Sequence, residues 1–231
     1  MSGRVVDIDV NPEEPTEFYV AYASGGVWHT INNGQSFAPI FDSTATLIIG
    51  DIAVNWKNKI IWVGTGEVNS SRSSYAGIGV YKSSNNGKTW DYLGLPESHH
   101  IGKIQLSPND PNTAWVAALG HLYSENKERG IYKTADGGKT WKQTLYIDAN
   151  TGGVDIDIDA KNTNILYAAM WYKTRSSSNF VESGKTSGIY KSTDGGVSFN
   201  VVYSGGIVPP PNIGPRSIQG SPVGLGAANY N

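Results

Sequence analysis

The sequence predicts an all-β fold, a β-propeller of four four-stranded blades. A composition of 28 glycines, 13 tyrosines and 7 tryptophans, with only 16% charged residues, favours short strands and tight turns over helices. One sequence motif also recurs four times along the 231 residues, and two strand-like segments precede each copy. Four short strands per unit of about 50 residues are typical of propeller blades.

The recurring motif reads Gly, β-branched residue, aromatic, Lys or His, Ser or Thr, any residue, Asp or Asn, any residue, Gly, any residue, Ser or Thr, aromatic. Its four copies start at Gly26, Gly79, Gly130 and Gly188 and end at Phe37, Trp90, Trp141 and Phe199. The closing aromatic residues are 53, 51 and 58 positions apart. Such a near-constant period indicates a repeat architecture.

The centre of each copy is an Asp box, Ser/Thr-x-Asp-x-Gly-x-Thr/Ser-Trp/Phe. Its acidic or amide position is occupied in chain order by Asn32, Asn85, Asp136 and Asp194. We expect this side chain to accept backbone N–H groups within a hairpin turn, while the glycine supplies a positive φ. The closing aromatic residue is expected to anchor the following strand. We interpret the box as a structural turn rather than as a metal or ligand site.

Each predicted blade has four strands: two come before the box, a third leads into it and a fourth leaves it. The predicted blades cover residues 1–47, 48–98, 99–149 and 150–203. The segment 204–231 contains six glycines, five prolines and no fifth box, so it is predicted to be a linker or the start of a next blade. We expect the four blades to be part of a larger ring, completed by further blades of a longer parent chain or by self-assembly.

Composition excludes several classes of function. A net charge of −2 and a pI near 6.1 give no basic surface for nucleic acid. The absence of cysteine excludes disulfides and thiolate metal sites. No apolar run approaches the roughly 18 residues of a membrane span, so we expect no membrane insertion. We also expect no cofactor.

In a four-stranded blade, the loop between the second and third strands and the connection between blades open on one face, opposite the boxes. The sequence predicts a ligand-binding rim on that face, formed by Arg72, Tyr75, His100, His121, Arg129, Trp171 and Arg175. Arginine suits carboxylates, and aromatic rings suit sugars or peptide side chains. In the alternative interpretation, each arginine pairs with a local glutamate and holds its own loop.

Histidines and aspartates suggest two further groupings. His99, His100 and His121 could ligate a metal, but adjacent residues of an extended segment point to opposite sides, so at most one of the pair faces His121. We therefore predict no metal site. In the first strands, Asp7, Asp51 and Asp155 share one register, with Lys103 in the third blade, and are expected to line or border the central channel.

Several segments also carry a family resemblance. They are Ile49–Val54, Trp62–Glu67, Gly79–Ser83, His100–Lys103, Val116–Leu122, Asn126–Gly130 and Leu166–Trp171. Roughly from residue 3 to residue 203, the chain resembles the sortilin-like, or BNR-repeat, propeller proteins of bacteria, which are often labelled glycosyl hydrolases. The resemblance implies a secreted, periplasmic or cell-surface protein of greater length.

Two kinds of function follow from these observations. The first is a non-catalytic module that binds protein, peptide or glycan ligands through its rim, or that assembles with other subunits. The alternative is a fragment of a sialidase-like or xyloglucanase-like glycoside hydrolase, which needs two carboxylates across the scissile bond. Asp51 and Glu67 are the best candidate pair. An open blade also exposes strand edges or an apolar face, which favours assembly.

Overall fold

The computed structural model describes residues 3–204, and these form an all-β structure. Four four-stranded antiparallel sheets contain, in order, β1 (Val5–Val10), β2 (Phe18–Tyr22), β3 (Gly26–Thr30), β4 (Ala38–Pro39); β5 (Ile49–Asn55), β6 (Ile60–Thr65), β7 (Val80–Ser83), β8 (Asp91–Tyr92); β9 (Ile101–Leu106), β10 (Ala114–Ala118), β11 (Gly130–Thr134), β12 (Lys142–Leu145); and β13 (Thr151–Ile158), β14 (Leu166–Tyr172), β17 (Gly188–Ser192), β18 (Asn200–Ser204). A hairpin of β15 (Thr174–Arg175) and β16 (Phe180–Val181) and one 3₁₀ turn, η1 (Pro96–Ser98), are added to the sheets.

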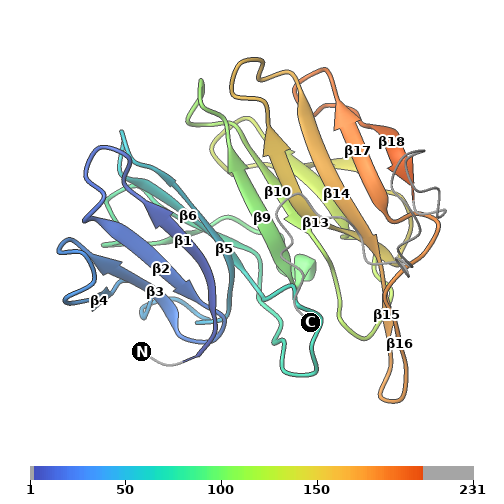
Figure 1. Cartoon of the computed structure of the whole chain (residues 1–231), viewed down its shortest axis with the longest axis horizontal. Coiled ribbons are helices and arrows are strands. Elements are labelled where there is room, and N and C mark those ends of the chain that lie inside the picture. The colour runs from blue at the N-terminus through green and yellow to red at the C-terminus, as the bar shows by residue number, and fades with distance from the viewer. Residues whose placement is uncertain (1–2, 205–231) are drawn as a thin grey trace, which may run out of the picture.

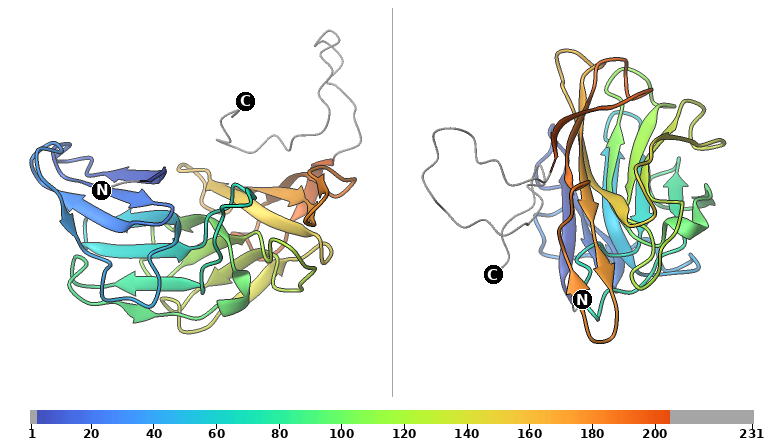
Figure 2. Two further views of the ribbon diagram at one scale, coloured as in Figure 1. Left: turned by 90° about the horizontal axis from the view of Figure 1, so that it is seen from below. Right: turned by 90° about the vertical axis from the view of Figure 1, so that its right-hand side faces the viewer.

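Each sheet is a meander in which strands that are consecutive along the chain pair in order. The four sheets stand side by side like sectors of a ring (Figures 1 and 2). Their first strands, β1, β5, β9 and β13, are in contact with one another in sequence. The predicted fold class, a partial β-propeller with four four-stranded blades, is therefore confirmed.

The exact blade boundaries stay a prediction. Of the predicted linker 204–231, Ser204 ends β18, and the rest lies outside the described residues. The described part of the chain contains no helix with the length and hydropathy needed to cross a membrane.

The hydrophobic core lies between the sheets rather than at a single centre. Three clusters fill the three spaces between neighbouring blades, and each combines side chains from both blades. The strand Ala114–Ala118 is buried along its whole length because it is covered on both faces. Apolar strands such as this one therefore hold the blades together by packing face to face.

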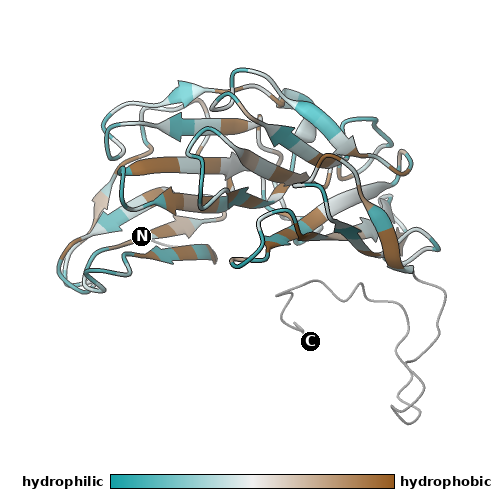
Figure 3. Cartoon of the chain, turned by 90° about the horizontal axis from the view of Figure 1, so that it is seen from above, coloured by the Kyte–Doolittle hydropathy of each residue, from teal (hydrophilic) through white to brown (hydrophobic). Residues whose placement is uncertain are grey.

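The four blades side by side form an open fan, and the blades at its two ends differ from those in its interior. Three apolar side chains of β1 (Val5, Ile8 and Val10) are 45–52% exposed, and three side chains of β18 (Val201, Val202 and Tyr203) are 43–60% exposed. Figure 3 shows that apolar segments run along the strands of the sheets, including the terminal ones. Equivalent faces in the interior of the fan are covered by a neighbouring blade.

The turn between the third and fourth strands of each blade is held by the side chain at the Asp or Asn position. Asp136 Oδ1 accepts the N–H of Thr140 at 2.9 Å, and its Oδ2 accepts the Thr140 hydroxyl at 2.6 Å. These hydrogen bonds lower the pKa of Asp136 to about 2. Gly138, with φ of 93°, takes the left-handed conformation that the turn needs. Corresponding bonds are made by Asn32, Asn85 and Asp194.

In the second and third blades, the closing aromatic residue is hydrogen-bonded to the blade before it. The indole N–H of Trp90 donates to the Ile40 carbonyl at 2.7 Å, and that of Trp141 donates to the Leu93 carbonyl at 2.8 Å. Phe37 packs edge-on against Phe18 in its own blade, and Phe199 packs against the cluster between the last two blades. These two indole hydrogen bonds thus connect the motif to the residue that directly follows the outer strand of the preceding blade.

We expect Trp141→Phe to lower the free energy of unfolding by about 1 kcal/mol, because the Leu93 carbonyl loses its donor while the ring is largely kept. Urea denaturation measures this change. Trp171→Phe is the matched control, since its indole N–H donates to the Glu182 carbonyl in an exposed loop. An equal loss in both variants would mean that the bond between blades contributes nothing of its own.

Candidate functional site

The loops between second and third strands meet the connections between blades on one face of the fan. Gly77 N–H donates to the His99 carbonyl at 2.6 Å, and the Asn126 side chain donates to the Glu97 carbonyl at 3.0 Å. The motif turns instead contact the turns between first and second strands, as in Gly137 N–H to the Asn112 carbonyl at 2.9 Å. We call the first surface the loop face: residues 66–79, 95–100, 119–129, 146–150 and 173–187.

Glu67 lies at the base of the loop face, where it is 2% exposed. Its two carboxylate oxygens accept hydrogen bonds from Nε and one terminal nitrogen of Arg4. The same carboxylate also accepts a hydrogen bond from the Asn69 amide at 2.8 Å and one from the Ser74 hydroxyl at 3.2 Å. Both oxygens are thus occupied by donors of the protein itself.

Asp51 lies on the first strand of the second blade and is 3% exposed. Its carboxylate accepts the Ile104 N–H at 2.7 Å and the Lys103 ammonium at 3.1 Å, and both donors belong to the third blade. Burial pushes the pKa of Asp51 well above its usual value. Although burial opposes it, the carboxylates of Asp51 and Asp7 raise the pKa of Lys103.

Asp51 and Glu67 therefore belong to different networks. Among the described residues they share no hydrogen-bond partner. The Asp51 carboxylate joins two inner strands, whereas that of Glu67 holds a loop. Neither has an oxygen free of a protein donor.

The three rim arginines bind backbone carbonyl groups. Arg129 is 1% exposed, and its terminal nitrogens donate to the carbonyls of Leu119, His121 and Ser124, each at 2.8 Å. Burial lowers its pKa to about 10. Arg129 is therefore an internal support of its loop, and we do not include it among the residues that contact a ligand from solvent. Within residues 3–204 Arg129 forms no ion pair with a local glutamate, although the charges of Asp148 and Glu125 partly offset the effect of burial on its pKa.

Arg72 and Arg175 connect loops of different blades. The terminal nitrogen of Arg175 donates to the Ser70 carbonyl at 2.6 Å, and a terminal nitrogen of Arg72 donates to the Ser177 carbonyl at 3.4 Å. The Arg175 guanidinium also lies over the Phe180 ring, 4.7 Å from its centroid. The second and fourth blades thus share one loop surface.

The histidines divide between the interior and the surface. His100 is 2% exposed, and its Nδ1 lies 2.8 Å from the Glu67 carbonyl. The ring that stacks on His121 is that of His99, with 3.8 Å between centroids. Glu97 Oε2 lies 3.2 Å from Nε2 of His121 and 3.8 Å from Nε2 of His99. Glu97, His99 and His121 thus each offer one ligand atom within 4.8 Å of the other two, a grouping that could hold a metal ion although the sequence predicted no metal site.

Exposed aromatic rings stand on the loop face. Tyr75 is 63% and Tyr123 is 57% exposed. Trp171, near the end of β14 next to the loop face, is half-buried, with its indole N–H donated to the Glu182 carbonyl at 2.6 Å and its ring edge-on to Phe180. Two tyrosines therefore offer flat faces to a ligand.

The loop face also holds a cavity of about 190 Å³ between the third and fourth blades. It is lined by Leu122, Tyr123, Ser124, Glu125, Arg129, Asn150, Lys173, Thr174 and Arg175. Lys173 is 1% exposed, and its ammonium donates to the carbonyls of His121 at 2.9 Å and Leu122 at 3.1 Å. Burial, followed by the charges of Arg129 and Arg175, lowers its pKa to about 7. Nothing in the local sequence singled out Lys173.

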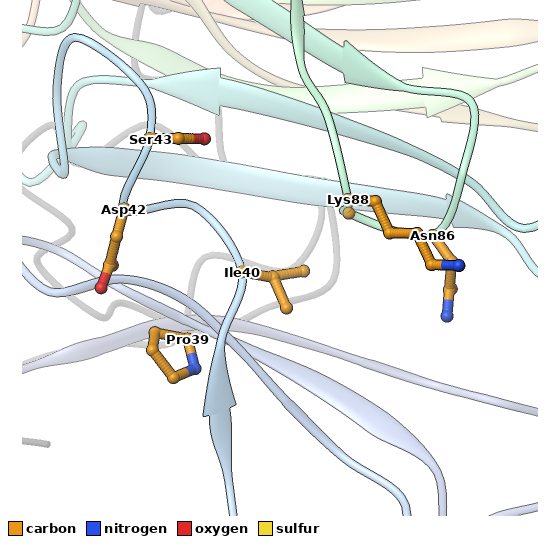
Figure 4. A pocket seen from close by; sticks show the side chains of 7 residues that line it. Pro39, Ile40, Asp42, Ser43, Asn86 and Lys88 are labelled. Atoms are coloured by element: carbon orange, nitrogen blue, oxygen red, sulfur yellow. The ribbon is translucent and has the colours of Figure 1, made fainter.

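A second, more open cavity of about 320 Å³ lies beside the outer strand of the first blade (Figure 4). Pro39, Ile40, Asp42 and Ser43 face the motif turn of the second blade at Asn86 and Lys88. None of the predicted site residues lines it. We therefore base the functional argument on the loop face.

Comparison with known proteins gives short matches to much longer chains. No family model matches the sequence. The chain is 34% identical over 79 residues to vacuolar protein sorting/targeting protein 10 of Kluyveromyces lactis, a match covering 34% of this chain and 5% of that protein. It is 27% identical over 125 residues to a probable oligoxyloglucan-reducing end-specific xyloglucanase of Neosartorya fischeri. That match covers 53% of this chain and 14% of the xyloglucanase.

Solved structures support the fold. An ancestral GH74 enzyme superposes with a TM-score of 0.67 at 21% identity, over 88% of this chain and 24% of the enzyme. The GH74 xyloglucanase of Xanthomonas campestris superposes with a TM-score of 0.61 at 14% identity, over 85% of this chain and 29% of the xyloglucanase. These likenesses place the chain among β-propellers and show that it spans a small part of each of these relatives.

Proposed function

We propose that the chain is a non-catalytic β-propeller module that binds a glycan or peptide ligand on its loop face. The observation that carries this proposal is that loops of the second, third and fourth blades are hydrogen-bonded into one surface. Arg175 to the Ser70 carbonyl joins the fourth blade to the second, and Lys173 to the His121 carbonyl joins it to the third. Such preorganised loops bind without a large ordering cost.

The state of the candidate carboxylates supports binding rather than catalysis. Glycoside hydrolysis needs one carboxylic acid and one carboxylate facing each other across the scissile bond. Glu67 is paired with Arg4, and Asp51 is bound by Lys103 and the Ile104 N–H. Two carboxylates committed in this way to separate protein donors are poorly placed to share a substrate.

We expect Tyr75→Ala and Tyr123→Ala each to weaken ligand binding by about tenfold, because an exposed ring contributes both area and stacking. Titration calorimetry against xyloglucan oligosaccharides and against a peptide panel provides the measurement. Tyr203→Ala is the control, since Tyr203 is 43% exposed on β18, outside the loop face. If no ligand of either panel binds, or if Tyr203→Ala weakens binding as much as the loop-face variants do, the loop face is not the binding surface.

A hydrolase fragment is the second candidate, favoured by the 27% identity to a probable xyloglucanase. Incubation with xyloglucan and measurement of new reducing ends tests it. Hydrolysis that Asp51→Asn or Glu67→Gln abolishes, in variants that remain folded, would favour this candidate over a binding module.

We also propose that the repeat is an Asp-box, or BNR, repeat of a secreted sortilin-like protein, with the blade boundaries given above. The exposed apolar side chains at both ends of the fan support assembly with further blades or with a second copy. Light scattering coupled to size exclusion measures the molar mass. A mass near 24.8 kDa indicates a lone chain, and about twice that value indicates two copies closing one ring.

A further inference from the structure

The 190 Å³ cavity of the loop face has an unusual balance of charge. Arg129, Lys173 and Arg175 all line it, and the first two are each 1% exposed. Within the described residues 3–204, no carboxylate oxygen lies within 4.0 Å of any of these three cations. The carboxylates of Asp148 and Glu125 act on Arg129 from farther away. Buried cations are costly unless a close counter-charge compensates them, and the lowered pKa of Lys173 reflects that cost. An anion bound in this cavity would offset it.

Donors for such an anion remain available. Lys173 donates two of its three N–H groups to carbonyls. Arg175 donates one terminal nitrogen to the Ser70 carbonyl, and its buried Nε has no partner among the described residues. The terminal nitrogens of Arg129 are bound to carbonyls, so Arg129 contributes its positive charge rather than a ligand contact, and its buried Nε has no hydrogen-bond partner among the described residues. Phe180 fixes the plane of the Arg175 guanidinium.

Two other groups at the cavity indicate what the anion is attached to. The Glu125 carboxylate is held by the Asn150 amide at 2.9 Å and accepts hydrogen bonds, which suits hydroxyl groups and disfavours a second negative charge. Tyr123, 57% exposed, offers an aromatic face to a ring. A carboxylate, neighbouring hydroxyls and a flat ring face together describe a sugar acid.

We propose that this cavity binds a carboxylate-bearing sugar unit, with the carboxylate on Lys173 and Arg175 and a hydroxyl on Glu125. This inference rests on the proposed binding function and names its ligand class. Arg129 contributes positive potential and holds the loop, while Tyr123 stacks on the sugar ring. Neutral sugars lack the group that compensates the cations, so they bind more weakly at this cavity.

The test compares galacturonic acid with galactose, which differ by the carboxylate, using calorimetry or NMR titration of the whole chain. We expect galacturonic acid to bind at least about tenfold more tightly. Arg175→Gln is expected to remove this preference, and Lys173→Met is a second variant that keeps the buried stem. Lys57→Gln is the control, because Lys57 is exposed in the turn between β5 and β6 and does not line the cavity. Circular dichroism confirms that each variant is folded.

Equal binding of the two sugars, or a preference that survives Arg175→Gln and Lys173→Met, overturns the inference. Tighter binding of an N-acetylated dipeptide carboxylate than of galacturonic acid also overturns it, in favour of a peptide terminus. If these results occur while neutral glycans or peptides still bind in a Tyr75- and Tyr123-dependent manner, the proposed function stands and only the sugar-acid site fails. If no saccharide or peptide binds, both fail.

Discussion

Asp51→Ala is expected to lower the free energy of unfolding by about 3 kcal/mol, the low end of the cost of removing one partner from a buried ion pair, because the Lys103 side chain is 34% exposed. The Asp51 carboxylate is 3% exposed and accepts both the Lys103 ammonium and the Ile104 N–H. Alanine leaves that N–H unpaired and leaves the ammonium without its nearest counter-charge, at the seam between the second and third blades. Urea denaturation followed by tryptophan fluorescence measures the change.

Asp155→Ala is the matched control for Asp51. Both residues follow a bulge in the first strand of their blade, Asp51 opposite Gly64 and Asp155 opposite Ala169. Within residues 3–204, however, the Asp155 carboxylate accepts a hydrogen bond only from the N–H of the next residue, Ile156, at 2.9 Å, and the Lys103 charge acts on it without a hydrogen bond. We expect a loss of about 1 kcal/mol or less. A loss as large as that of Asp51→Ala would show that the strand position, and not the bond between blades, determines the effect.

The fold could be predicted because a repeat is visible in one dimension. The motif copies give the number of blades, and alternation along the first strands places Asp7, Asp51 and Asp155 in one register. Their partners could not be predicted. Asp51 was expected to line or border the channel, yet it is buried and accepts the Ile104 N–H, because a neighbouring blade presents its backbone there. Sequence register identifies the acceptor but not the donor that lies some 50 residues away.

The loop face was harder to predict because its long side chains bind backbone groups. Arg129 is surrounded by carbonyls of its own loop, and the sequence carries no signal for carbonyl acceptors. Lys173 likewise enters the interior to bind the His121 carbonyl. For the adjacent histidines, alternation allowed only one to face His121. The left-handed φ of 51° at His99 and the bond of His100 to the Glu67 carbonyl determine which one it is.

His100 gives the second large prediction, a loss of stability in mild acid. Burial, followed by the charge of Lys173, lowers the pKa of His100 from 6.5 to about 4 in the folded protein. The unfolded chain binds a proton near pH 6.5, which the folded protein does not yet bind. The free energy of unfolding should therefore fall as the pH drops from about 6.5 to about 4, by up to roughly 3 kcal/mol from this group. Urea denaturation at pH 7.0, 5.5 and 4.5 measures the slope.

His100→Gln separates this contribution from that of the other titrating groups. Glutamine keeps a side-chain donor for the Glu67 carbonyl but takes up no proton, so the variant should lose stability less steeply between pH 6.5 and pH 4. His29→Gln is the control, because His29 lies in the first blade beside Glu17, with its pKa lowered by burial but raised in part by that carboxylate. An unchanged slope in His100→Gln would mean that the folded protein accepts a proton on His100 near its ordinary pKa. His100 would then open to solvent together with the Glu67 loop, and the loop face would be less rigid than its hydrogen bonds indicate.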